Sequence, residues 1–181
     1  MKLYPVYQAI ENRENPDEIE KNGPVKGIHN PWLGTGYYFG DGFIENAHWW
    51  GKHHVRSEDY MICQACIDVC EENYLDLYGN TNDIKWFSKT IEEIKRNLNI
   101  QSITVSQAIS FLKRVSVRFN EYTVIRAETP HCGNNLPSNS LNYVECNKSQ
   151  LELCRMIQVC VYKKEIIHEY KIVYPSMYVA E

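Results

Sequence analysis

The hydrophobic pattern of this chain changes its period twice, and that change limits the possible folds more than any other feature. Residues 3 to 10 alternate between apolar and polar side chains, as half-buried strands do. Residues 83 to 98 instead repeat apolar side chains at helical spacing, and residues 104 to 115 do the same. Strand-like stretches then return, at 121–128, 156–164 and 169–175. Strands at both ends of the chain and helices in its middle predict an α+β fold.

Shorter elements are expected from the residues that begin and end them. Asn15, Pro16 and Gly23 are typical of the cap, the first turn and the end of a short helix over 15–23. A second helix is expected over 43–54. Strands are expected at 36–39 and 60–69, a turn at Gly79–Asn80, a polar loop over 129–149 and one helical turn over 151–156. The last two strands are expected to pair as a hairpin.

The helix expected over 83–98 carries its apolar side chains in one stripe. The members of this stripe are Ile84, Phe87, Ile91, Ile94 and Leu98. The following helix has Thr104 or Ser106 as its expected cap. The default interpretation is that the stripe packs on the core of the domain itself. A second interpretation is that this helical segment covers an acceptor or binds a partner.

Length and composition describe an ordinary globular protein. The 181 residues fit a single domain over 1–181, and 44% hydrophobic residues exclude a disordered chain. The net charge of −4 excludes a basic field over the whole surface, such as nucleic-acid-binding proteins carry. A local basic patch is still present at Lys52, His53, His54 and Arg56.

The N-terminal residues and the cysteines indicate a cellular compartment. The first 18 residues lack the apolar stretch of a secretory signal, and no apolar run reaches the length of a membrane helix. Seven cysteines, an odd number, are scattered along the chain. We therefore expect a cytoplasmic protein with free thiols and no membrane partner.

Two groups of residues have the chemistry of metal ligands. Cys63 and Cys66 have the spacing of a zinc or redox pair, but they lie in a strand pattern and no second pair follows. His48, His53 and His54 have no carboxylate at a clear ligand spacing. We therefore expect no metal site, and histidines that are solvated or that line a pocket.

Residues 34 to 51 carry the densest chemical signal. A Gly34-Thr35-Gly36 turn leads into the aromatic residues Tyr37, Tyr38 and Phe39, and a short loop and the sequence Asn-Ala-His-Trp-Trp follow. Aromatic rings on separate elements can form a slot for a flat cationic ring, and glycines let the backbone approach it. The alternative is a core strand and a helix with simply buried aromatics.

The stretch from Gly36 to Asp41, followed by Ala47-His48-Trp49, resembles the central motif of the ADP-ribosyltransferase fold. The resemblance is to the diphtheria-toxin and poly-ADP-ribose-polymerase side, and also to small bacterial proteins with a GxGFYF-type motif. The spacing from Tyr38 to Trp49 equals that of the two family tyrosines that sandwich nicotinamide. The resemblance implies split antiparallel β-sheets with flanking helices, and leaves residues 80 to 118 as a helical insert.

The same resemblance implies that the chain uses NAD as its substrate. Tyr38 and Trp49 would hold nicotinamide, while Gly34, Thr35, Gly36 and Tyr37 would present groups to its amide or to the ribose. Tyr7 and Gln8 stand where the family grips the adenosine ribose with His or Arg, and both can hydrogen-bond a hydroxyl. All of these are expected cofactor-binding residues.

The family often places a catalytic Glu at the start of a late strand. Gln158 occupies that place by element order, and it cannot act as a general base. Glu121 is a rival that comes before the long loop, so we favour Gln158, with Tyr38, as the catalytic positions. Arg126 could bind a phosphate, or pair with Glu128 on one strand face.

These residues lead to three functional hypotheses. The first is an NAD-dependent mono-ADP-ribosyltransferase acting on a protein or nucleic acid, such as a bacterial toxin or defence effector with an antitoxin or immunity protein as partner. The second is a catalytically inactive domain that binds NAD or ADP-ribose. The third is a structural or interaction domain whose aromatic residues form a core.

Overall fold

The computed structural model describes residues 1–27, 31–55, 59–129, 140–142, 150–152 and 155–179. The strands in the first half of the chain are β1 (Lys2–Glu11), β2 (Lys26–Gly27), β3 (Gly36–Asp41), β4 (Tyr60–Asp68) and β5 (Tyr74–Asp76). Those in the second half are β6 (Val124–Glu128), β7 (Ser140–Asn142), β8 (Gln150–Glu152), β9 (Ile157–Val161) and β10 (Ile167–Tyr174). The helices are α1 (Pro16–Asn22), α2 (Ile44–His54), α3 (Thr81–Leu98), α4 (Val105–Val115) and α5 (Val117–Asn120). Short 3-10 turns cover Glu71–Asn73, Lys164–Ile166 and Ser176–Tyr178.

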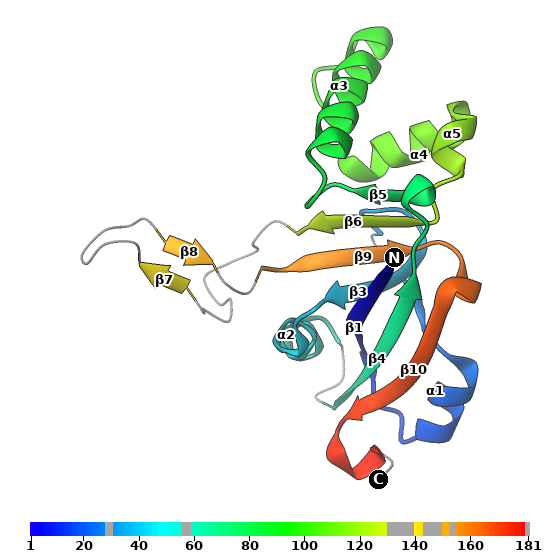
Figure 1. The fold of residues 1–181 in the computed structure, drawn as a ribbon, viewed down its shortest axis with the longest axis vertical. Helices are drawn as coiled ribbons and strands as arrows, with labels where there is room; N and C mark the ends of the chain where they lie inside the picture. Colours follow the sequence, from blue (N-terminus) through cyan, green and yellow to red (C-terminus); the bar gives the residue numbers. More distant parts are fainter. Residues whose placement is uncertain (28–30, 56–58, 130–139, 143–149, 153–154, 180–181) are drawn as a thin grey trace.

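Most strands join one large sheet in the order β10-β4-β1-β3-β9-β6-β5, and β2 pairs with β3 (Figure 1). All of its described pairings are antiparallel except that of β5 with β6. The α+β prediction is therefore confirmed. β7 and β8 form a separate two-stranded sheet, drawn away from the large sheet.

The sheet is narrowest between β1 and β3. Only Val6–Asp41 and Tyr7–Gly40 pair across this junction, whereas β1 and β4 pair along almost their whole length. Beyond Tyr7, β1 continues to Glu11 beside β4 alone. The strands thus form one hydrogen-bonded sheet with a constriction at β1–β3.

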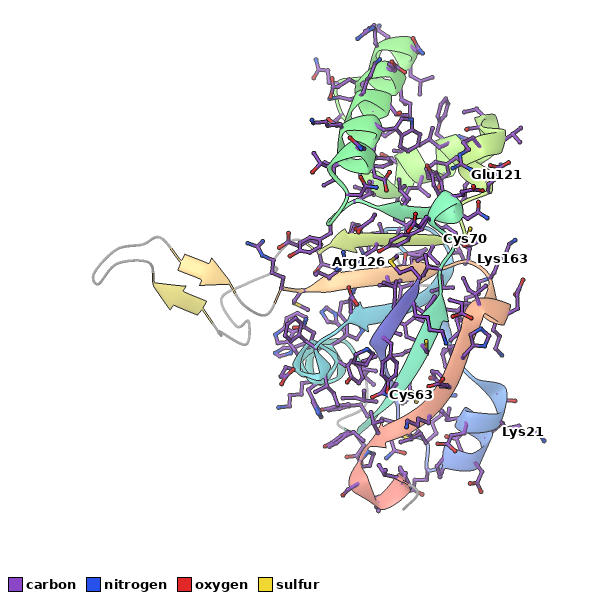
Figure 2. All side chains as sticks on the ribbon, in the orientation of Figure 1. Lys21, Cys63, Cys70, Glu121, Arg126 and Lys163 are labelled. Atoms are coloured by element: carbon purple, nitrogen blue, oxygen red, sulfur yellow. The ribbon has the colours of Figure 1, made fainter. Side chains whose placement is uncertain are left out.

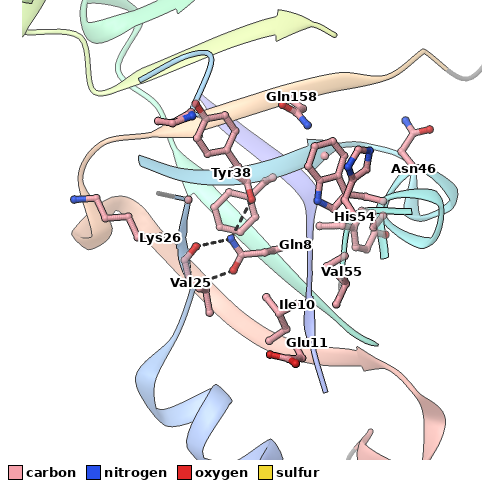
Figure 3. Close-up of a pocket in the computed structure, with 18 of the residues that line it drawn as sticks. Gln8, Ile10, Glu11, Val25, Lys26, Tyr38, Asn46, His54, Val55 and Gln158 are labelled. Carbon is pink, nitrogen blue, oxygen red and sulfur yellow. Dashed lines mark hydrogen bonds between the residues drawn. The ribbon is translucent and has the colours of Figure 1, made fainter. Parts of the chain in front are cut away.

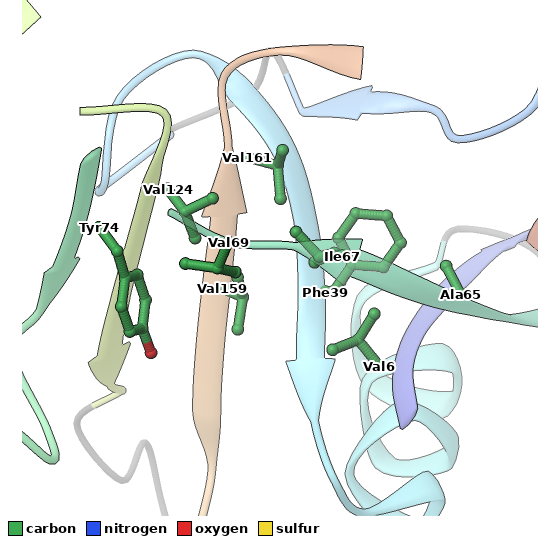
Figure 4. Packing of buried hydrophobic residues seen from close by; sticks show 9 residues of the cluster. All are labelled: Val6, Phe39, Ala65, Ile67, Val69, Tyr74, Val124, Val159 and Val161. Carbon is green, nitrogen blue, oxygen red and sulfur yellow. The ribbon is translucent and has the colours of Figure 1, made fainter. Parts of the chain in front are cut away.

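One face of the sheet is filled by aliphatic side chains from strands on both sides of this junction (Figure 4). Val6 on β1, Phe39 on β3 and Val159 on β9 are all buried there. β-Branched side chains pack well on a pleated surface, which explains why valine is common in this cluster. The cluster holds the two parts of the sheet together where the backbone pairing is shortest.

The opposite face is covered by helices. α2 packs on β4 through Ala47, and the ring of Tyr60 lies so close to Gly51 that a Cβ there would clash with it. α3 and α4 pack over β5, β6 and β9 through Ile94, Ile109 and Leu112. The helix at 104–115 is capped by Thr104 in a capping box with Gln107, as expected.

The helical segment connects β5 to β6. Because these two strands are parallel, the chain must cross over between them, and α3, α4 and α5 form that crossover. The segment is therefore part of the sheet's own connectivity. It packs on the core through Ile94 and Phe87, while Ile84, Ile91 and Leu98 stay outside that cluster.

Three local expectations were wrong. β9 and β10 do not form a hairpin, because β9 lies between β3 and β6 while β10 lies at the sheet edge beside β4. Residues 150–152 are a strand, not part of a helical turn, and β7 lies in the stretch expected to be a loop. The sequence of a strand does not specify which strand it pairs with, because pairing depends on the whole sheet.

Candidate functional site

A cavity of about 1080 Å³ opens where β1 and β3 part (Figure 3). Residues 7–11 of β1 line one side and residues 38–40 of β3 another, with α2, the β2 segment and β9 around them. Its size is close to the upper end of the range of small-molecule and cofactor sites, about 1,000 Å³. Its main polar and aromatic members are Tyr7, Gln8, Glu11, Arg13, Asn15, Lys26, Trp32, Tyr38, Asn46, Trp50, His54 and Gln158.

Tyr7, Gly40 and Gln158 stand abreast on β1, β3 and β9. Residues opposite one another in paired strands point to the same face, so all three face this cavity. A Cβ placed on Gly40 would meet only the Tyr7 carbonyl oxygen, at 3.8 Å. Gly40 therefore leaves open space between the side chains of Tyr7 and Gln158.

Gln8 bridges the gap between the diverging strands. It is 6% exposed, and its Nε2 donates to the Val25 and Tyr38 carbonyl oxygens, at 2.9 and 3.0 Å. Its Oε1 accepts from the Val25 amide at 2.8 Å and from the Tyr170 hydroxyl at 3.0 Å. Both hydrogens of the amide and both lone pairs of its oxygen are thus used within the protein. Gln8 lines the cavity as a structural bridge.

Gln158 differs from Gln8 in its bonding, although it is almost equally buried at 8% exposed. Its Oε1 accepts from the indole Nε1 of Trp32 at 2.7 Å. Among the described residues, its Nε2 has no hydrogen-bond partner. The indole fixes which end of the amide is the acceptor, so Nε2 is left as a donor at the cavity.

Trp32 was missed by sequence reasoning. It lies in the loop before Gly34, outside any periodic pattern, so nothing in the sequence connected it with Gln158, 126 residues away. The rival position, Glu121, is not in the cavity lining. It pairs with Arg118 at 2.6 Å, beside the helical segment (Figure 2).

Tyr38 contributes its ring to the cavity and keeps its hydroxyl for the protein. The hydroxyl donates to the Gly34 carbonyl at 2.7 Å and accepts from the Leu33 amide at 2.9 Å. Burial and the neighbouring Cys160 raise the pKa of Tyr38, so it stays protonated at neutral pH. Its ring also packs against Gly27, where a Cβ would lie 2.8 Å away.

The glycine turn serves packing. Gly36 lies against β9, since a Cβ there would be 2.6 Å from the Cys160 sulfur, and Gly34 has a φ of +89°. Burial raises the pKa of Cys160 to about 12, so its thiol can donate to the Gly34 carbonyl, 3.5 Å away. None of Gly34, Thr35, Gly36 or Tyr37 lines the cavity.

The aromatic wall on α2 is formed by Trp50 and His54. Their rings stack with centroids 4.1 Å apart and an interplanar angle of 25°, and both residues line the cavity. Trp49 stacks on His53 instead, with centroids 4.6 Å apart, and does not line the cavity. Burial and the neighbouring His53 lower the pKa of His54, so its ring is neutral at pH 7.

The fold thus brings together Tyr7, Gln8, Tyr38 and Gln158, and places Trp50 rather than Trp49 beside them. On a helix, neighbouring residues point about 100° apart, so a motif spacing one residue off selects a different face. The helix register decided between the two tryptophans, and packing of α2 against β1 and β4 sets that register.

Charged groups lie at the margins of the cavity. Arg13 is bound to Glu11 through contacts of 2.7 and 2.8 Å, while Lys26 has no carboxylate partner among the described residues. Asn15 donates to Glu18, and its Oδ1 is buried with no hydrogen-bond partner in the described part of the chain. These groups add one acceptor and one cation to the lining.

Arg126 is bound to two carboxylates outside the cavity lining. It contacts Asp41 at 2.6 Å and Asp76 at 3.2 Å, and all three side chains are at most 16% exposed. Glu128 pairs with Arg155 instead, at 2.7 Å, so the expected Arg126–Glu128 pair was wrong. With two carboxylates already bound, Arg126 has little attraction left for a phosphate.

The described residues contain no group of three or more His, Cys, Asp or Glu side chains that could hold a metal ion. Cys63 and Cys66 lie three residues apart on the regular strand β4, so their side chains point to opposite faces. Within the described ranges, no helix is long and apolar enough to cross a membrane.

No protein-family model matches this chain, and no curated protein or solved structure is significantly similar to it.

Proposed function

We propose that this chain binds NAD in the cavity between β1 and β3 and acts as a mono-ADP-ribosyltransferase. One observation carries the proposal. The resemblance to ADP-ribosyltransferases implies a role at the site for Tyr7, Gln8, Tyr38 and Gln158, which come from three strands, and all four line one cavity of cofactor size. Their convergence supports the split-sheet family as the origin of this site.

In this proposal nicotinamide stacks in the aromatic part of the cavity. Tyr38 on β3 and the Trp50–His54 pair on α2 supply its rings. A neutral His54 leaves the indole electron-rich, which favours the cationic nicotinamide ring through cation–π attraction. Trp50 therefore takes the role that the motif spacing had given to Trp49.

Gln158 holds the ribose in this proposal. Its free Nε2 donates to a ribose hydroxyl oxygen and positions the bond between ribose and nicotinamide for cleavage. That cleavage develops positive charge on the ribose, as in glycoside hydrolysis. Gln158 cannot stabilise this charge as a carboxylate does, so the chemistry depends on positioning and on the acceptor's own nucleophile.

A second candidate function is an NAD- or ADP-ribose-binding domain without turnover. The observation that favours it is again Gln158, because its amide is neutral and is already oriented by Trp32. Glu11, a carboxylate in the cavity lining, is bound to Arg13. Under this hypothesis the same cavity recognises the ligand and leaves it intact.

The acceptor and other partners follow from the transferase proposal. The acceptor is a protein or a nucleic acid, and a toxin of this kind would have an antitoxin or immunity protein that blocks the cavity. Lys52, in the last turn of α2, adds a cation on the helix that carries the aromatic wall. This charge would favour an acidic acceptor.

The test measures binding and cleavage of NAD separately. Purified protein is titrated with NAD while tryptophan fluorescence is followed, and nicotinamide release is then followed by chromatography. Gly40→Val is the blocking variant, because the new side chain would fill open space between Tyr7 and Gln158 without straining the strand. Gly42→Ala is its matched control in the turn after β3, where a Cβ meets nothing within 4 Å, although its φ of +77° adds local strain.

Each outcome separates the hypotheses. Release that Gly40→Val abolishes supports the transferase. Saturable binding without release, also blocked by Gly40→Val, supports the second candidate. If the wild-type protein neither binds NAD nor releases nicotinamide, both hypotheses are contradicted. The aromatic residues are then packing elements.

A further inference from the structure

The edge of β1 from which β3 diverges lies inside the cavity. The lining includes Gln8, Ala9, Ile10 and Glu11, which are four consecutive residues of β1. Figure 3 shows the side chains of Gln8, Ile10 and Glu11 along this stretch. Because successive side chains of a strand point to opposite faces, a cavity that meets all four residues runs along the edge of the strand.

The pairing with β4 determines which backbone groups face this edge. The Asn12 amide donates to the Asp59 carbonyl oxygen at 3.2 Å, and the register of β1 and β4 is regular from there back to position 6. In an antiparallel pair every second residue bonds the same neighbour, so positions 10 and 8 also bond β4. The amides and carbonyls of Ala9 and Glu11 therefore point away from β4.

The pairing with β3 agrees with this alternation. The Gly42 amide donates to the Pro5 carbonyl oxygen at 3.0 Å, and Tyr7 is the last residue of β1 that pairs with β3. Pro5 and Tyr7 thus use the same edge as Ala9 and Glu11, but β3 has left that edge beyond Tyr7. Within the described ranges, the amides and carbonyls of Ala9 and Glu11 have no hydrogen-bond partner.

The spacing of these free groups matches a polypeptide. Ala9 and Glu11 are two residues apart, so their donors and acceptors recur about every 6.8 Å, at about 3.4 Å per residue. An extended polypeptide repeats its own amides and carbonyls at the same distance, and can add to such an edge as a further strand. The edge is also recessed, since Gln8 and Ile10 beside Ala9 are only 6% and 7% exposed.

Helices give an added strand a wall on each face. On one face Ile10 packs with Ile19 of α1, and on the other Ala9 packs on the cluster under α2. Ile19 lines the cavity, and so do Trp50 and His54 of α2. The side chains of an added strand would point alternately to these two walls.

We propose that an extended segment of another protein enters the cavity and pairs with β1 at Ala9 and Glu11. The segment runs antiparallel to β1, as β3 and β4 do. Its residues opposite Ala9 and Glu11 exchange backbone hydrogen bonds with them and point to α2. The residues between these are aliphatic and pack on Ile10 and Ile19.

Such a segment would also keep NAD out of the cavity. Its side chain opposite Ala9 points toward the wall that carries Trp50 and His54, where nicotinamide is proposed to stack. An antitoxin or immunity protein could block the site in this way. The blocking role rests on the proposed function, whereas the pairing with β1 does not.

The test uses a labelled peptide of the sequence Lys-Val-Thr-Val-Thr-Val-Lys. In the proposed arrangement its threonine amides donate to β1 and its valines point to Ile10 and Ile19. One control peptide is N-methylated at both threonine amides, and a matched control is N-methylated at the first two valine amides. Fluorescence anisotropy measures binding to the full chain without NAD. Methylation at threonine should weaken binding about tenfold or more, and methylation at valine less than about threefold.

A variant and an exchange measurement connect this preference with β1. Ala9→Pro removes the free amide and leaves the bonds to β4 in place, because proline is tolerated where a strand amide has no partner. It should weaken the peptide about tenfold or more, whereas Ala9→Ser keeps the amide and should not. Circular dichroism checks that both variants are folded. In the wild type, the peptide should slow hydrogen exchange at the Ala9 and Glu11 amides and leave that of Ile10 unchanged.

Three results would overturn the proposal. The two methylated peptides could bind equally well, the unmethylated peptide could fail to bind the folded wild type at about 1 mM, or exchange at Ala9 and Glu11 could be unaffected. A failure of NAD to bind would not change these results, because the titrations contain no NAD. If NAD binds, saturating peptide should raise its apparent Kd about tenfold or more. An unchanged Kd for NAD would overturn the blocking role alone.

Discussion

Two places in the large sheet bury polar side chains, and they differ in how much hydrogen-bonding capacity is left over. Around Arg126, Nε donates to Asp41 and Nη1 donates to both oxygens of Asp76, and the Tyr78 and Gly79 amides also donate to Asp76. In the cavity at β1 and β3, Gln158 keeps a donor and Asn15 keeps an acceptor with no partner in the described part of the chain. Burial and charge therefore do not by themselves indicate a ligand site. Unused bonding capacity beside open space does.

The largest expected effect is on the Arg126 cluster. Arg126→Met should lower the free energy of unfolding by about 3–5 kcal/mol, because it leaves two carboxylates, each at most 16% exposed, without a counter-charge. Urea unfolding at pH 7 measures this loss. The control is the triple variant Arg126→Met/Asp41→Asn/Asp76→Asn, which removes all three charges and should recover much of it. Exposed ion pairs usually contribute less than about 1 kcal/mol. A loss of that size for Arg126→Met would show that the cluster is solvated, and would contradict its contrast with the cavity.

The next largest effect is the difference in stability between alanine variants of the two buried glutamines. Gln8→Ala should cost about 2–4 kcal/mol, because it leaves the Val25 amide and two carbonyl oxygens without their partner. Gln158→Ala breaks one hydrogen bond and should cost about 1 kcal/mol. Urea titrations of both variants give the difference. Equal costs would mean that Gln158 is as much a structural bridge as Gln8.

Ligand binding should show the opposite order for the two glutamines, with the larger effect at Gln158. Gln158→Ala should weaken NAD binding about tenfold, since it removes the donor proposed to hold the ribose. Gln158→Glu keeps an acceptor for Trp32 and adds the charge that the transferase family uses, so nicotinamide release should increase. Isothermal titration and release assays measure the two effects. Unchanged affinity in Gln158→Ala would exclude it from the site.

The smallest effect is the response to pH. Burial lowers the pKa of His48, and burial with His53 lowers that of His54, so the unfolded chain takes up protons first as pH falls through about 6.5. Stability should therefore fall below that pH, and NAD binding should weaken there as His54 becomes cationic. Melting temperatures between pH 5 and 8 test this. His54→Asn should remove the pH response of binding, and a response that persists would assign it to another group.

Sequence patterns predicted most elements because each depends on neighbours in the chain. The cap at Thr104, the Pro16 that begins α1 and the strand alternation of β1 are local features, and all are found. The partners of each strand were harder to predict. The expected hairpin of β9 and β10 failed because β9 is inserted between β3 and β6, a choice that depends on pairing across more than a hundred residues.

By itself, the sequence determined the α+β class and the helices within residues 83–115, because composition and period are read along the chain. The resemblance of its motif to the ADP-ribosyltransferase fold implied the candidates Tyr7, Gln8, Tyr38 and Gln158. Only the tertiary structure decided that Gln8 is fully bonded, that Trp32 orients Gln158, and that Trp50 rather than Trp49 reaches the cavity. The physical reason is the same in each case. A side chain's free donors, and the direction in which it points, are set by groups far away in sequence that the folded sheet brings within hydrogen-bonding distance.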